Sequence, residues 1–368
     1  KYCVFSSFVV INSPTIQKGI KMDPFTQGVL GAAFSQSFAK KSKIPLACFA
    51  GVVGGMAPDI DILIKSSSDP LLGIEFHRHF THSLWFIPIG GLIVAAAIWF
   101  IFCYLRANDK WNFKDIYLFT TLGYATHATL DACTSYGTRL FWPVSNERVA
   151  WDTVAVIDPI PSLLVFLFVV LSYRYRSAKL AQIGMVCMVG YLSLGFLQNS
   201  RVTNAIEQIA QSRGHTPERI KLNPTLGNLI VWRATYQYAG RYYVNAVIAQ
   251  PFSDIEIIEG SSVAAIDIET IYPELGRDSV GRNDLRRFNY FAEGYLFEYK
   301  GLIADLRYSA VPHKIQPIWG IELNLENPIQ HASYGSIVSP GGRALGVTWD
   351  MLWGNFKAEP KKESDLAS

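Results

Sequence analysis

The chain has 368 residues, half of them hydrophobic, and a formal net charge of +3 at pH 7. This length allows two or three domains, and so small a net charge gives no support for a nucleic-acid partner. All five cysteines precede residue 198, so they indicate neither a disulfide framework nor a cysteine-rich zinc module in the later part of the chain.

The composition changes sharply near residue 198, from long apolar runs to mixed and charged sequence. We expect an α-helical polytopic membrane domain followed by a mostly antiparallel β (α+β) C-terminal domain outside the membrane. The predicted organisation is an N-terminal extension, the membrane domain, the strand-rich domain and a disordered tail, over residues 1–21, 22–198, 199–357 and 358–368.

Apolar runs predict the helices of the first region. The uncharged run from Ser83 to Leu105 has 23 residues, enough to cross a hydrocarbon core of about 30 Å. Further spans are expected over residues 115–134, 154–173 and 180–198. Two glycine-containing stretches, residues 24–39 and 44–64, add a fifth or sixth span if they cross fully.

Basic residues predict the orientation of these spans. Alternating crossings gather nine of them in three loops on one face: Lys40, Lys41, Lys43, Arg106, Lys110, Lys114, Arg174, Arg176 and Lys179. The loops of the opposite face hold only Lys65, Arg78, Arg139 and Arg148. The positive-inside rule makes the first face cytoplasmic and the second periplasmic or extracytoplasmic.

Alternating hydrophobicity predicts strands in the second region. Glycine or proline bounds the five predicted strands, residues 229–236, 242–249, 262–268, 295–299 and 302–308. A short helix over residues 203–212 is expected before them. The number of preceding spans places this domain on the non-cytoplasmic face, provided that residues 180–198 cross the membrane.

The same orientation brings the candidate metal ligands to one face, although neither acids nor histidines were used to derive it. Nine side chains share the outer face: Asp23, Asp59, Asp61, His77, His82, His127, Asp131, Asp152 and Asp158. His127 and Asp131 are spaced i, i+4 and therefore share one helix face. Because ionisable groups inside a span are costly, such a pair indicates a functional site.

Mixed imidazole and carboxylate donors suit zinc, manganese or iron. We expect one or two ions, zinc or manganese, held by Asp23, Asp59, His77, His82, His127, Asp131 and Asp158. A bound divalent cation lowers the pKa of a water to about 7, and an unligated aspartate then serves as general base. The predicted catalytic residues are Asp61, Asp152 and Arg78, with Arg78 as a clamp for an anionic oxygen.

Each of these residues also has an ordinary structural interpretation. Asp158-Pro159 is a good helix cap followed by proline at the first helical position. His127 and Asp131 are compatible with a hydrogen-bonded pair between helices. His79 is the histidine with the weakest claim to a metal. The gathering of the candidates on one face is what favours the metal site over these separate roles.

Five pieces of sequence resemble the membrane-bound, metal-dependent hydrolases, a bacterial inner-membrane family that includes LexA-regulated, YdjM-like proteins. The pieces are residues 22–28, 58–61, 77–83, 127–138 and 157–159. Gln27 departs from the histidine that some relatives have there. The resemblance implies a multi-span inner-membrane protein with a metal site and hydrolase activity.

Two functions follow as expectations. The first is metal-dependent hydrolysis of an ester or phosphoester at the non-cytoplasmic face, with a membrane-adjacent small molecule or lipid head group as substrate and the bilayer as partner. The alternative is a non-catalytic membrane protein that binds or transports metal or other ions, because intramembrane aspartate and histidine also serve transporters.

Overall fold

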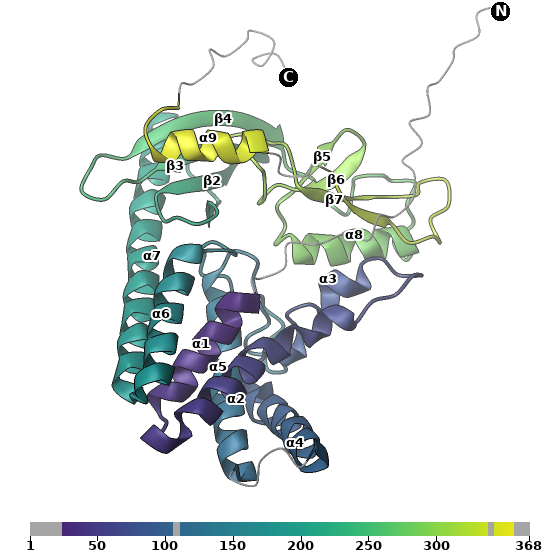
Figure 1. Ribbon diagram of the computed structural model, residues 1–368. Helices are drawn as coiled ribbons and strands as arrows, with labels where there is room; N and C mark the ends of the chain where they lie inside the picture. The colour runs from purple at the N-terminus through teal and green to yellow at the C-terminus, as the bar shows by residue number, and fades with distance from the viewer. Residues whose placement is uncertain (1–23, 106–110, 338–341, 357–368) are drawn as a thin grey trace, which may run out of the picture.

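The computed structural model describes residues 24–105, 111–337 and 342–356. Helices form the first part of the chain, and two antiparallel sheets dominate the second (Figure 1). The expected N-terminal extension, the candidate ligand Asp23, the basic residues Arg106 and Lys110, and the expected tail lie outside the described residues.

Six helices of more than two turns build the helical part within the described residues. They are α1 (Pro24–Ser37), α2 (Ile44–Met56), α4 (Ile87–Leu105), α5 (Phe113–Cys133), α6 (Pro159–Tyr175) and α7 (Ala178–Ser212). Short elements connect them: η1 (Lys41–Lys43), η2 (Ala57–Leu63), α3 (Leu72–Phe76), η3 (Phe80–His82) and η4 (Leu84–Phe86). Helix α1 contacts α2, α5, α6 and α7 and is the centre of the bundle.

Glycines let α1, α2 and α5 approach backbone to backbone. A Cβ added at Gly31 of α1 would lie 2.3 Å from the carbonyl oxygen of Gly51 in α2. On its other side, α2 meets α5, where a Cβ at Gly54 would lie 2.3 Å from the carbonyl oxygen of Thr120. Close approach through small residues is the usual mode of helix packing in membranes.

Three helical stretches are long and apolar enough to cross a membrane: Lys41–Leu63, Leu84–Tyr104 and Ala178–Ser212. Helix α6 is apolar but shorter. Large apolar side chains on these helices point outward, as on lipid-facing surfaces, among them Phe100 of α4 and Val186 of α7. The helical class of the first region is therefore confirmed, while the number of crossings stays a prediction.

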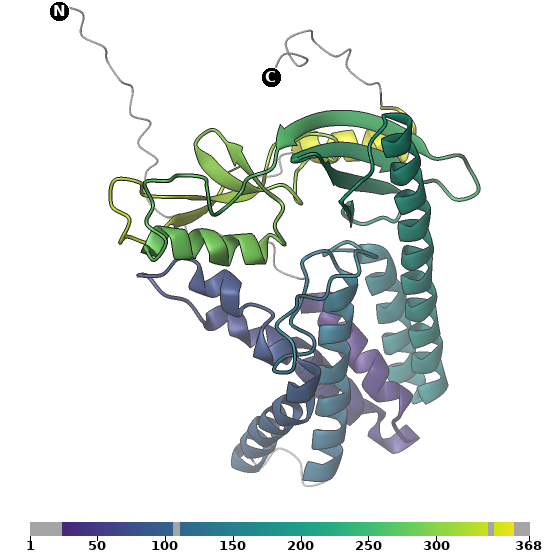
Figure 2. The ribbon, with the colours of Figure 1, turned by 180° about the vertical axis from the view of Figure 1, so that it is seen from behind.

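Helix α7 continues well beyond the domain boundary expected at residue 198. The short helix predicted over residues 203–212 is its C-terminal part, because neither glycine nor proline interrupts the chain from Phe196 to Ser212. This half of α7 packs on the first sheet through Val202, Ile206 and Ala210. The helix thus joins the two regions rigidly (Figure 2).

The second region contains two four-stranded antiparallel sheets. The first consists of β1 (Arg219–Pro224), β2 (Val231–Tyr238), β3 (Arg241–Ile248) and β4 (Glu256–Ala264), in that order. The second consists of β5 (Leu296–Tyr299), β6 (Leu302–Asp305), β7 (Trp319–Glu322) and β8 (Ser333–Ser336). The expected antiparallel class is confirmed. The predicted strand over residues 262–268 is only the end of β4, and β1, β7 and β8 were not predicted.

Two helices cover the sheets. Helix α9 (Gly342–Leu352) places Met351 against the first sheet, on the face opposite to α7. Helix α8 (Val280–Phe291) buries Leu285 and Phe288 against the second sheet. Both views show α8 lying along α3 of the helical part (Figures 1 and 2).

An arginine of α8 joins this helix to the loop that precedes the His77 motif. The Arg287 guanidinium donates to both carboxylate oxygens of Asp69 at 2.9 and 3.0 Å and to Glu75 at 2.8 Å. It also donates to Asp284 of its own helix at 2.9 Å. The second region therefore restrains the position of a loop that leads into the candidate site.

Candidate metal centre

Two histidines from different elements meet in the interior of the helical part. His127 belongs to α5, and His82 ends η3. Both side chains are fully buried, and their Nε2 atoms lie 3.0 Å apart. Burial of two imidazoles with facing nitrogens needs a compensating partner, because isolated polar groups are costly in the interior.

The partners of the Nδ1 atoms determine which nitrogen of each ring carries the proton. His127 Nδ1 lies 2.6 Å from the carbonyl oxygen of Gly55, which can only accept, so Nδ1 donates. His82 Nδ1 lies 3.0 Å from the hydroxyl oxygen of Thr81, whose own proton goes to Asp61 Oδ2, and 3.2 Å from that carboxylate oxygen. Both neighbours can accept, so Nδ1 donates. Both Nε2 atoms then present lone pairs to one another, as metal-ligating histidines do when a carbonyl or carboxylate fixes the tautomer.

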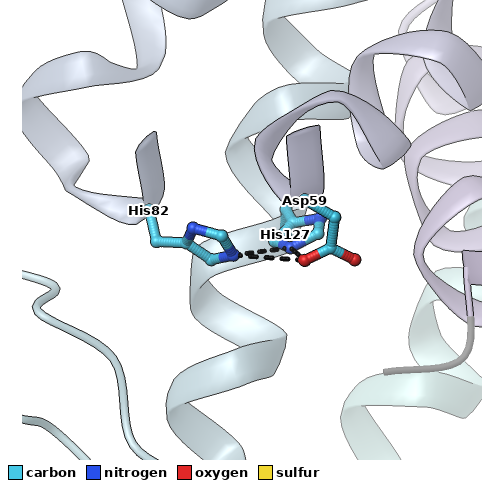
Figure 3. A group of neighbouring side chains, drawn as sticks. All are labelled: Asp59, His82 and His127. Carbon is cyan, nitrogen blue, oxygen red and sulfur yellow. Dashed lines mark hydrogen bonds and ion pairs between the residues drawn. The ribbon is translucent and has the colours of Figure 1, made fainter. Parts of the chain in front are cut away.

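Asp59 of η2 supplies a third donor (Figure 3). Its Oδ1 lies 3.5 Å from His82 Nε2 and 3.3 Å from His127 Nε2. This oxygen is buried and accepts no hydrogen bond. Ligands bound to one zinc ion at about 2.0–2.2 Å in tetrahedral geometry are roughly 3.3 Å apart, so the three atoms fit a shared cation.

Asp131, one turn beyond His127 on α5, offers a fourth donor. Its Oδ2 lies 3.2 Å from His82 Nε2 and 3.7 Å from His127 Nε2, and this buried oxygen forms an ion pair with Arg78 Nε at 3.0 Å but accepts no hydrogen bond. The other oxygen, Oδ1, accepts a hydrogen bond of 2.8 Å from Gln27 Nε2. Two buried carboxylate oxygens that accept no hydrogen bond, together with two imidazole nitrogens, fit a divalent cation.

The Asp61 carboxylate interacts with several residues that surround these ligands. Its Oδ1 pairs with His77 Nδ1 at 2.9 Å. Its Oδ2 accepts from the Arg78 backbone N–H at 2.9 Å and from the Thr81 hydroxyl at 2.8 Å, besides facing His82. Since donors surround both oxygens and the side chain is buried, the carboxylate is placed to orient histidines.

Arg78 lies beneath the ligands and is only 1% exposed. Its Nε is 3.0 Å from Asp131 Oδ2, and its Nη1 donates to the Thr134 hydroxyl at 3.0 Å. The guanidinium stacks over the ring of Tyr136 at 4.5 Å from the centroid. Arg78 adopts a left-handed backbone conformation with φ of +62°.

His77 lies at the edge of the centre, with 17% of its side chain exposed. Donor atoms of His77, Asp59 and Asp61 all lie within 4.8 Å of one another and form a second group that could hold an ion. Asp59 belongs to both groups. The geometry is therefore compatible with the expected one or two ions.

The structure does not bring Asp152 and Asp158 to these ligands. Asp152 pairs with Lys221 of β1 at 3.0 Å, and burial, reinforced by Glu293 and opposed by Lys221, raises the pKa of its carboxyl to about 6. Asp158 caps α6 by accepting from the Ile160 N–H at 3.2 Å and takes a hydrogen bond of 2.6 Å from the Tyr191 hydroxyl. Asp158 is therefore a helix cap, as its ordinary structural interpretation proposed.

Sequence reasoning missed two groups that position the ligands. Gln27 is fully buried in α1 and holds Asp131. The signal that could have indicated it is the position itself, because some relatives have a histidine there. The second group, the Gly55 carbonyl, is backbone and has no sequence signature beyond the glycines that let α2 approach α5.

Comparisons with known proteins find a matching family and similar proteins in two bacteria. Residues 22–202 match the YdjM inner membrane protein family. Uncharacterized protein YfhP of Bacillus subtilis (strain 168) is 24% identical over 272 residues, which cover 72% of this chain and 78% of that protein. Inner membrane protein YbcI of Escherichia coli (strain K12) is 30% identical over 119 residues, 30% of this chain and 63% of that protein. No solved structure matches significantly.

Proposed function

Because residues 22–202 make this chain a member of the YdjM inner membrane protein family, we propose that its buried histidine and aspartate cluster holds a divalent metal that serves hydrolysis. The substrate is an ester or phosphoester at the membrane surface. One observation carries the proposal: His82 Nε2, His127 Nε2 and the unpartnered Asp59 Oδ1 converge within 3.5 Å of one another in the interior.

The donor set favours zinc or manganese over calcium or magnesium, because imidazole nitrogens suit the transition metals. Three protein ligands with a remaining open position are typical of catalytic zinc sites. When bound, the cation supplies Lewis acidity to a substrate oxygen and acidifies a water. In hydrolysis the water oxygen bonds to the carbonyl carbon or phosphorus, the ester C–O or P–O bond breaks, and the leaving oxygen takes the proton.

The residues beneath the ligands act as positioning residues in this proposal. Asp61 fixes the ring of His82, and the Gly55 carbonyl fixes that of His127. Arg78 holds Asp131 through its guanidinium, and its burial removes it from direct contact with a substrate in the bulk phase. We accordingly assign Asp61 and Arg78 to orienting roles, and Asp152 to the ion pair with Lys221.

We further propose that the centre faces the non-cytoplasmic side. Lys40, Lys41 and Arg176 line one shared surface at the end of the bundle, formed by the chain after α1 and the turn after α6. The sheets lie at the opposite end (Figure 1). The positive-inside rule favours the cytoplasm for the basic end, which leaves the sheets and the adjoining centre outside.

A non-catalytic metal site is the second candidate, and one observation favours it. Asp131 Oδ2 lies close enough to both imidazoles to complete a set of four protein ligands. Structural zinc sites are closed in that way, whereas catalytic sites keep a position for water. Turnover therefore decides between the two candidates better than metal content does.

The test uses full-length protein purified in detergent and loaded with zinc or with manganese. Bis(p-nitrophenyl) phosphate and p-nitrophenyl butyrate serve as the phosphoester and ester probes. We expect metal-dependent release of p-nitrophenol that is lost in His82→Ala and kept in His79→Ala. Loaded protein that hydrolyses neither probe, but carries zinc or manganese across liposome membranes, would support transport instead.

A further inference from the structure

The metal centre is open to its surroundings at few places. The side chains of His82, His127 and Asp131 are fully buried, whereas 20% of the Asp59 side chain is exposed. Asp59 belongs to η2, the segment that follows α2. A substrate that reaches the ligands through this opening must therefore pass along η2.

The three-residue period of η2 gives this segment three distinct faces, because side chains at i and i+3 eclipse one another in a 3₁₀ helix. Pro58 and Asp61 form the buried face. Asp59 is on the second, half-buried face. Ile60 and Leu63 form the third, and they are 65% and 74% exposed. We call the pair Ile60 and Leu63 the η2 ridge; it borders the face that carries Asp59.

The η2 ridge is continuous with a surface suited to lipid. Residues Lys41–Leu63 form one of the three stretches that could cross a membrane, and the ridge is the end of that stretch. Helix α4 contacts η2, and the η4 turn that precedes α4 exposes Trp85 at 62%, an amphipathic ring of the kind found at membrane interfaces. The ridge therefore adjoins lipid-facing helices on both sides.

We propose that the substrate is a membrane lipid that reaches Asp59 sideways from the bilayer, with its acyl chain along the η2 ridge and its polar ester or phosphoester at the metal ligands. This inference rests on the proposed function and adds the substrate class and its direction of approach. The apolar ridge lets the acyl chain remain among apolar groups until the head group reaches the ligands, so the lipid need not enter water.

An aqueous route is the competing possibility. His77 is the other partly exposed residue of the centre, and it lies under the second region, with its ring packed against Tyr136. Tyr136 in turn contacts Phe291 of α8. A water-soluble substrate would approach from that side and would not contact Ile60 or Leu63.

The first experiment compares two phosphatidylglycerols that share a head group, in detergent-solubilised, metal-loaded full-length protein. One has palmitoyl and oleoyl chains and the other two hexanoyl chains. Ile60→Ser/Leu63→Ser should raise KM for the long-chain lipid about tenfold, through loss of apolar contact, and leave the short-chain lipid nearly unchanged. The masses of the products identify the bond that is cleaved.

The matched control is Leu163→Ser/Leu167→Ser on α6, two exposed apolar residues of a lipid-facing helix away from η2, which should change neither KM. An unchanged KM for the long-chain lipid in the η2 double variant would overturn lateral approach. Equal losses for both lipids would also overturn it, since the ridge would then support the site as a whole.

A second measurement needs no turnover. The protein is placed in vesicles of phosphatidylglycerol and phosphatidylethanolamine that include a phosphatidylglycerol with a diazirine in one acyl chain. After illumination, we expect mass spectrometry to find lipid attached to η2 in an amount that falls at least threefold when EDTA removes the metal. Attachment to α6 should be insensitive to EDTA.

Attachment to η2 that EDTA leaves unchanged, or that is confined to α4, α6 and α7, would overturn the inference. Metal-dependent attachment without hydrolysis of either phosphatidylglycerol would instead retain the lipid site and remove the proposed hydrolase activity. The two proposals can thus fail independently.

Discussion

The Nε2 atoms of His82 and His127 face each other at 3.0 Å, and each Nδ1 faces fixed acceptors: the Thr81 hydroxyl and Asp61 for His82, and the Gly55 carbonyl for His127. Two lone pairs held at this distance repel unless a cation lies between them. The surrounding acceptors therefore arrange the imidazoles for a metal before it binds, which lowers the cost of binding.

Asp61→Asn tests this arrangement. An amide has one acceptor oxygen and turns an NH₂ group toward the donors of His77, Thr81 or His82. We expect the affinity for zinc to fall about 10–100-fold, while saturating zinc still restores the wild-type metal content. Competition with a fluorescent chelator measures the affinity. Equal zinc affinities in variant and wild type would show that Asp61 does not orient the ligands.

Gly55→Ala should separate α1 from α2. The added Cβ would lie 2.4 Å from the Gln27 carbonyl oxygen, and the strain should cost about 1–3 kcal/mol of stability. Because Gly55 also positions His127, metal affinity should fall together with the Tm. Gly190→Ala in α7, where a Cβ meets nothing within 4 Å, is the matched control. A Tm equal to that of this control would refute the backbone contact.

The raised pKa of Asp152 should make the stability of the folded protein depend on pH, independently of the metal. Burial raises the pKa of its carboxyl to about 6, above the ordinary 3.8, so between these values the folded protein keeps a proton that the unfolded chain has lost. The contribution of Asp152 to stability therefore falls as the pH rises from about 4 to about 6.

Asp152→Asn should remove this contribution. The Tm of the variant, relative to the wild type, should be higher at pH 7 than at pH 4.5, as followed by thermal unfolding in detergent. Hydrolysis should persist in the variant, because Asp152 pairs with Lys221 and not with the metal ligands. Loss of hydrolysis with normal metal content would restore Asp152 as a general base.

Arg287→Ala should release the loop before the His77 motif. Loss of the charged hydrogen bonds to Asp69 and Glu75 should lower stability by about 2 kcal/mol and speed the cleavage of the loosened loop by trypsin at the exposed Lys65. The neighbouring Arg286 pairs with the exposed Glu269 and donates to the Arg277 carbonyl oxygen, neither of which belongs to this loop. Arg286→Ala should therefore leave the rate of cleavage at Lys65 unchanged. Identical digestion patterns for the two variants would contradict a restraint by Arg287.

Sequence patterns could predict the convergence of Asp59, His82, His127 and Asp131, because the i, i+4 spacing and the basic loops together place these residues at one end of the helices. The same patterns could not predict which atoms face the metal and which ones orient the ligands. The role of Asp61 depends on which donors surround its carboxylate, and residues from two separate turns provide them. The partner of Asp152 belongs to the second region, far away in sequence.

The unpredicted strands have a similar explanation. β7 and β8 each contain a glycine, a residue depleted in strands, and they exist through pairing with each other and with β6. β1 contains Lys221, which looks solvent-facing in sequence but is buried by its ion pairs with Asp152 and Glu293. Tertiary partners thus override local propensity at these positions.

The most direct test of the account is the zinc and manganese content of the purified full-length protein, measured by inductively coupled plasma mass spectrometry. We predict at least one ion per chain in the wild type and in His79→Ala, and none in His82→Gln/His127→Gln. The Tm of this double variant should lie within the range of the other variants, which shows that the protein is still folded. A wild-type protein that retains no transition metal after loading and dialysis, or a double variant that retains the full amount, would contradict the metal centre.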